Sequence, residues 1–78
     1  MQKLRPDLDI GQNISALRRA AKLTQDQTIA RMQLAGLEIS KSTYAKIETN
    51  RMNIKVSELV ALKQIFNVDY NAFFENLK

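Results

Sequence analysis

The sequence contains no cysteine and no histidine among its 78 residues. The absence of cysteine excludes disulfides and thiol chemistry, and without either residue type the usual zinc sites cannot be built. Glycine and proline are rare, with two and one residues, so collagen-like or long irregular structure is not expected. No apolar run approaches the roughly 20 residues that span a membrane, and we expect no signal peptide, because no apolar run of that kind follows the first residues. We therefore expect a cytoplasmic protein without a membrane segment, metal or cofactor.

Groups for catalysis are equally scarce. The sequence has no glycine-rich phosphate-binding loop, and no two carboxylates are spaced as an acid and base on one helix face. We therefore expect that the protein is not an enzyme. Hydrophobic residues make up 45% of the chain, and its length suits one small core. We expect residues 1–78 to form a single domain, with an N-terminal arm over 1–9.

Positive charge is locally concentrated between residues 40 and 55. The net charge is +4, and between residues 40 and 55 the only anion is Glu48. The cations of this stretch are Lys41, Lys46, Arg51 and Lys55. Such a concentration suits a polyanionic partner such as nucleic acid, although an ordinary solvated surface has the same appearance.

The first half of the chain shows the signals of two helices. Apolar residues recur every three or four positions over residues 11–22, which predicts an amphipathic helix. Thr24 and Gln27 have the spacing of a capping box, so a second helix should run over 25–35. Gly36 is suited to the left-handed conformation that ends a helix.

Three more helices are expected in the second half. Ser40 is a good N-cap for a short helix over 41–48. Asn50 tolerates the positive φ of the turn that follows. Apolar residues at helical spacing predict a fourth helix between Val56 and Phe66, and a fifth is expected over 70–77. No segment alternates with the two-residue period of a strand, so the predicted fold is all-α.

The helices over 25–35 and 41–48 are the informative unit. The first is capped, a glycine lies between them, and the second begins with Lys, Ser and Thr. A helix in the major groove presents its first turn to base edges, where short polar side chains permit close approach and cations meet guanine or phosphate. On these residues alone, a helical hairpin with capping serines is the alternative.

Short motifs extend this unit over residues 14–74, namely Leu17-Arg18, Leu23-Thr24-Gln25, Ser40 to Tyr44, Ile47-Glu48, Asn50-Arg51, Leu59 to Leu62 and Phe66 to Val68. Together they resemble the phage repressor and Cro type of helix-turn-helix domain, the XRE family. The resemblance implies a compact five-helix, lambda-repressor-like domain whose second and third helices form the helix-turn-helix. It also implies a sequence-specific transcriptional regulator, a repressor, that binds double-stranded DNA as a homodimer.

The resemblance assigns roles to individual residues. Base contacts fall on Lys41, Ser42 and Lys46 of the third helix. An ion pair between Arg18 and Glu48 links the first helix to the end of the third. The expected phosphate contacts are Gln25, Thr43, Asn50, Arg51 and Asn53.

Three features depart from the family pattern. Residues 32–40 form a connection several residues longer than usual. Thr28-Ile29 stands where Leu-Ala is customary. Tyr44 replaces an aliphatic core residue, so we expect a packed ring whose hydroxyl points to water or phosphate. These departures bear on the tilt of the third helix.

A protein-binding role is the main competing function. The fourth and fifth helices could hold a partner, as in an antitoxin or antirepressor, with or without DNA binding. Such a partner would leave the helix over 41–48 accessible, because the two surfaces face different directions.

Overall fold

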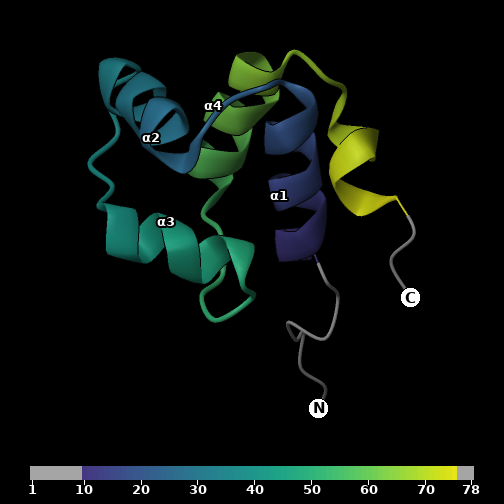
Figure 1. The fold of residues 1–78 in the computed structure, drawn as a ribbon, viewed down its shortest axis with the longest axis horizontal. Helices are drawn as coiled ribbons and strands as arrows, with labels where there is room; N and C mark the ends of the chain where they lie inside the picture. Colours follow the sequence, from purple (N-terminus) through teal and green to yellow (C-terminus); the bar gives the residue numbers. More distant parts are fainter. Residues whose placement is uncertain (1–9, 76–78) are drawn as a thin grey trace.

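The computed structural model describes residues 10–75, and within this range the chain folds into four α-helices and one 3-10 helix without strands (Figure 1). In chain order these elements are α1 (Ile10–Ala20), α2 (Gln25–Leu34), α3 (Lys41–Glu48), α4 (Val56–Phe66) and η1 (Tyr70–Phe74). The prediction of an all-α fold is confirmed for these residues. Residues 1–9, expected as an arm, lie outside the described range.

The prediction of five α-helices is corrected at the C-terminal end. The fifth element is a 3-10 helix of five residues, and the backbone is extended again at Glu75. The amide of Asn13 on α1 donates hydrogen bonds to the carbonyls of Phe73, at 2.9 Å, and Glu75, at 2.8 Å. These carbonyls are therefore held by α1 instead of continuing a helix. The predicted end of the helix at residue 77 lies outside the described residues.

The helix starts predicted from the capping residues Thr24 and Ser40 are confirmed. The Thr24 hydroxyl accepts a hydrogen bond from the Gln27 amide at 3.0 Å, and the Gln27 side chain accepts one from the Thr24 amide at 2.9 Å. This is a complete capping box. The Ser40 hydroxyl accepts a hydrogen bond from the Thr43 amide at 3.1 Å and so caps α3.

All four α-helices end in the same motif. A residue with positive φ follows the last helical residue by one or two positions. Its N–H bonds to the carbonyl three residues earlier, and the next N–H bonds to the carbonyl five residues earlier. This is the Schellman motif. The residues with positive φ are Lys22 (63°), Gly36 (96°), Asn50 (62°) and Asn67 (58°). Lys22 is the unexpected member, and it ends α1 two residues before the predicted boundary.

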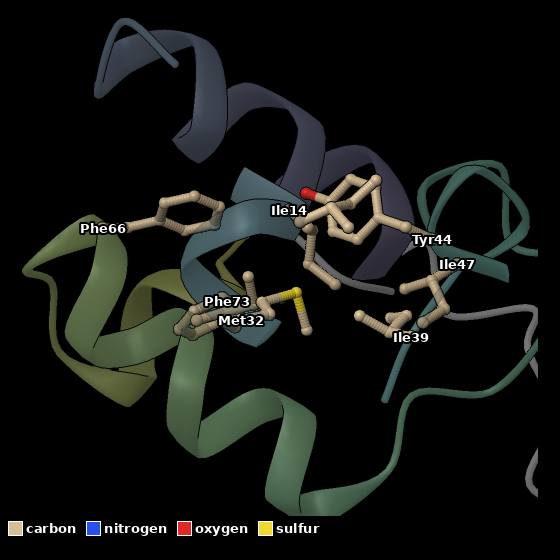
Figure 2. Packing of buried hydrophobic residues seen from close by; sticks show 9 residues of the cluster. Ile14, Met32, Ile39, Tyr44, Ile47, Phe66 and Phe73 are labelled. Atoms are coloured by element: carbon tan, nitrogen blue, oxygen red, sulfur yellow. The ribbon is translucent and has the colours of Figure 1, made fainter. Parts of the chain in front are cut away.

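The core lies between the four helices and η1 (Figure 2). Phe66 and Phe73 stack with their ring centroids 6.5 Å apart and join α4 to η1. The other labelled side chains come from α1, α2, α3 and the α2–α3 connection, and they are Ile14, Met32, Ile39, Tyr44 and Ile47.

The long α2–α3 connection is packed against the domain. Ile39 is buried in the core, and the Gln33 side chain donates a hydrogen bond to the Ile39 carbonyl at 3.1 Å. Thr28, where the family pattern has a leucine, is fully buried and donates its hydroxyl to the Thr24 carbonyl at 2.9 Å. Its polar group is thus satisfied within α2, so both departures fit the fold without a buried unpaired group.

Candidate nucleic-acid interface

The outward face of α3 is polar and cationic. Lys41, Ser42 and Lys46, the predicted base contacts, are all exposed, whereas Tyr44 and Ile47 pack inward. Ser42 and Lys46, four positions apart, share one face of the helix, and Lys41 lies beside them at about 100° per residue. The three predicted residues therefore fall within about 140° of the circumference of α3. In Figure 1, α3 lies along the lower edge of the molecule, next to the first turn of α1.

Two small residues complete this outward face. Ala45 and Thr49 follow Lys41 and Ser42 at helical spacing, and Ala45 is half-buried at the centre. The sequence interpretation did not single them out. An alanine there leaves space for close approach, and its methyl group is of the kind that contacts thymine in the major groove.

Lys41 is paired with the start of α2. Its Nζ lies 3.0 Å from Oδ1 of Asp26, with side chains 63% and 73% exposed. An ion pair this exposed contributes at most about 1 kcal/mol, so a phosphate or a guanine can replace the Asp26 carboxylate at little cost.

The other end of α3 is fixed to α1 by Arg18 and Glu48. Nε of Arg18 lies 2.7 Å from Oε2 of Glu48, and Nη2 lies 3.3 Å from Oε1. Nη1 donates to the Leu23 carbonyl at 2.8 Å. The side chains are only 12% and 4% exposed. This two-point contact sets the orientation of α3 relative to α1.

The pKa values of this cluster follow from its burial and hydrogen bonds. Burial alone would raise the pKa of Glu48, but hydrogen bonding, first from Arg18 and also from Gln25, holds that pKa below its ordinary value. The Glu48 hydrogen bond raises the pKa of Arg18. The pair is therefore fully ionised at neutral pH.

The expected orientation of the Tyr44 hydroxyl is wrong. Tyr44 is completely buried, and its hydroxyl has no hydrogen-bond partner of good geometry within residues 10–75. Burial, with Glu48 close by, raises the pKa of Tyr44. The reason is the packing of α3 on α1, which directs the ring and its hydroxyl toward the Arg18–Glu48 pair instead of the surface.

Gln25 combines a structural contact with a position suited to anions. It is the first residue of α2, and its Nε2 donates to Oε1 of Glu48 at 2.9 Å. A side-chain amide carries two hydrogens, so one is left to donate outward. The helix dipole and the N–H groups of the first turn also favour an anion at this place.

The remaining predicted phosphate contacts occupy different environments. Arg51 and Asn53 are exposed in the loop after α3. Thr43 is half-buried, and its Oγ1 accepts a hydrogen bond from the Ser40 hydroxyl at 3.1 Å. Oδ1 of Asn50 accepts a hydrogen bond from the Gly11 amide at 3.1 Å and so caps the first turn of α1. The structure thus gives Asn50 a structural contact that the sequence interpretation did not foresee.

Gly11 was also missed, although it lies where α1 meets α3. It is buried, and a Cβ at this position would lie 2.5 Å from the Ile47 carbonyl and 2.7 Å from that of Glu48. Only glycine lets the two helix ends come this close. The available signal was an isolated glycine inside a helical pattern, which commonly has a packing reason.

A family model described as a helix-turn-helix domain matches residues 11–76. The chain belongs to this helix-turn-helix family. Comparison with curated proteins gave no match, and neither did comparison with solved structures. The assignment of α2 and α3 as the two helices joined by the turn, and the finer resemblance to the phage repressor and Cro type, stay predictions for this helix-turn-helix domain.

Two classes of feature are missing from the described part of this domain. No helix within residues 10–75 is long and apolar enough to cross a membrane. Over the same range, no three histidine, cysteine, aspartate or glutamate side chains gather where a metal ion could bind.

Proposed function

We propose that this helix-turn-helix domain is a sequence-specific DNA-binding regulator of transcription that reads the major groove with α3. The observation that carries the proposal is the outward face of α3, where Lys41, Ser42 and Lys46 are exposed around the small Ala45. Lysine donates to the acceptors of guanine and serine hydrogen-bonds to several bases. A helix with this face fits the width of the major groove.

Phosphate contacts would position α3 without reading sequence. Gln25 supports one at the start of α2, because Glu48 holds its amide at 2.9 Å and leaves the second N–H to donate. Arg51 and Asn53 support others in the exposed loop after α3.

We further propose that the domain acts as a homodimer and represses transcription by occupying its site. One short helix reads too few base pairs for useful specificity, so two half-sites centred about 10 base pairs apart are expected. Side chains on α4 and η1 support a protein contact there, since Val60, Tyr70 and Phe74 are 38%, 41% and 48% exposed. The same surface supports the second candidate, a foreign protein partner of the antitoxin or antirepressor kind.

Site selection from a random duplex pool tests this function. The wild type should select one site, and Ala at Lys41 or Ser42 should relax the choice at particular base pairs, each costing about 1–3 kcal/mol against the best site. Gln25→Ala is the matched control for a phosphate contact and should weaken binding to selected and unrelated duplexes by similar factors. No duplex binding at low salt would contradict the proposal, and so would an unchanged site in the Lys41 and Ser42 variants.

Insertion of five base pairs between the selected half-sites tests the dimer. This change rotates one half-site by about half a helical turn, so tight binding should be lost. Sedimentation of the complex gives the number of protein chains per duplex. Undiminished affinity for the altered site, or one chain per duplex, would contradict the symmetric dimer.

A further inference from the structure

An open pocket of about 380 Å³ lies where α1, the start of α2 and the outward side of α3 meet. Three polar residues of α1, Gln12, Ser15 and Arg19, form one wall. Gln25 of α2 forms another, and Ala45 of α3 and its C-cap residue Thr49 form the third. The pocket therefore opens beside the face of α3 that the proposed function places in the major groove.

We infer that this pocket binds a backbone phosphate of DNA, with Arg19 as the charged contact, an assignment that rests on the proposed function. Neither Arg19 nor Ser15 was singled out by the sequence pattern. The contact would be an additional one, made by α1, next to the phosphate contact expected at Gln25.

The charges around the pocket favour an anion. Glu48 also lines it, but its carboxylate accepts hydrogen bonds from Arg18, at 2.7 Å and 3.3 Å, and from Gln25, at 2.9 Å. The negative charge of Glu48 is therefore matched by Arg18. Arg19 forms no ion pair with any residue that the structure describes. The residues that line the pocket therefore carry one positive charge that no carboxylate balances.

The position of the Arg19 guanidinium is set by a hydrogen bond. Its Nη2 donates to the hydroxyl of Ser15 at 2.5 Å, and Ser15 is buried, with 8% of its surface exposed. A guanidinium has five N–H donors, and this contact uses one. The others are available in the fork geometry that suits phosphate oxygens.

A backbone phosphate is the anion that fits the location. When α3 lies in the groove, a strand that borders the groove must pass the start of α2, where the helix dipole favours a phosphate. The pocket adjoins that point through Gln25 and adjoins α3 through Ala45 and Thr49. The neighbouring phosphate of the same strand then lies within reach of Arg19.

The salt dependence of duplex binding tests the inference. Arg19→Gln should reduce the log–log slope by about 0.9, the value for one phosphate. Between 50 and 200 mM salt, the advantage of the wild type should then shrink about 3.5-fold. Arg19→Lys should keep the slope. The matched control is Arg31→Gln, because Arg31 is exposed in the last turn of α2, outside the pocket.

A scan with neutral methylphosphonate linkages locates the phosphate. At one position in each half-site, replacing the phosphate by this linkage should weaken duplex binding by the wild type. The same replacement should leave the duplex affinity of Arg19→Gln unchanged. The inference is overturned if Arg19→Gln has the wild-type slope and the same linkage sensitivity, or if it changes the selected bases. A wild type that binds no duplex would instead overturn the proposed function itself, so the two failures are distinguishable.

Discussion

Glu48→Gln is the most informative single substitution in this domain. It keeps the shape of the side chain but leaves the Arg18 guanidinium, 12% exposed, without its counter-charge. Removing one partner of a buried ion pair costs about 3–5 kcal/mol. Arg18 keeps its hydrogen bond to the Leu23 carbonyl, at 2.8 Å, so we expect the lower end, about 3 kcal/mol. For a domain of this size that corresponds to a melting temperature lowered by roughly 12–24 °C.

Urea denaturation of four proteins measures the coupling between the two residues. These are the wild type, Arg18→Met, Glu48→Gln and the double variant. Each single variant leaves one buried charge, and the double variant leaves none, so it should be less destabilised than the sum of the two singles, with a coupling above about 1 kcal/mol. A coupling near zero would refute the argument that this pair fixes α3 on α1.

The pH dependence of stability gives an independent test of the same pair. The pKa of Glu48 is lowered in the folded protein, with Arg18 the main hydrogen-bond donor that opposes the effect of burial. Its contribution to stability is therefore complete above the unfolded pKa, about 4.3, and is lost as the pH falls through the folded pKa. The wild type should lose stability more steeply than Glu48→Gln below about pH 5. Parallel curves would contradict this, and Glu38→Gln, at an exposed carboxylate, is the control.

Three further substitutions test other contacts. Gly11→Ala should destabilise the fold in urea by about 1–3 kcal/mol, because a Cβ would lie 2.5 Å from a main-chain carbonyl of α3; equal stability would contradict that contact. Lys22→Gly should stabilise the fold by about 1 kcal/mol, because the φ of Lys22 is 63° and only glycine adopts this angle without a steric cost. Lys22→Ala keeps the Cβ and should not stabilise the fold. Asp26→Asn should raise affinity for any duplex by at most about fivefold, because its carboxylate holds Lys41 at 3.0 Å. Asp69→Asn is the control. Equal duplex affinities of Asp26→Asn and the wild type would contradict the idea that Asp26 competes with DNA for Lys41.

The helices could be predicted because their start and end signals are local. The Thr24 box, the Ser40 cap and the glycine at position 36 each act within one helical turn. Lys22 carries no such signal. Its left-handed conformation follows from the turn that leads from α1 into α2, in which the Leu23 amide bonds to the Arg18 carbonyl at 3.2 Å. That turn is a property of the packed helices, so the end of α1 was predicted too late.

The exposure of the candidate site residues could be predicted from the sequence, but the contacts between helix ends could not. The exposed face of α3 follows from helical spacing alone. Arg18 and Glu48, 30 residues apart, were paired only through the resemblance to known domains. The contact between Gly11 and Asn50 spans 39 residues, and nothing in the local sequence announces it. Asn50 was therefore assigned to DNA without its contact to α1.

The orientation of α3 depends on contacts at its two ends more than on the length of the connection before it. At its start, Ile39 is 5% exposed and its carbonyl is held by Gln33 at 3.1 Å. At its end, Glu48 is held by Arg18, and the following turn contacts the first turn of α1. The extra residues of the connection lie between fixed points, and Leu34 before them is 88% exposed. In this domain the long connection therefore joins two fixed points, and the contacts at those points set which face of α3 is outward.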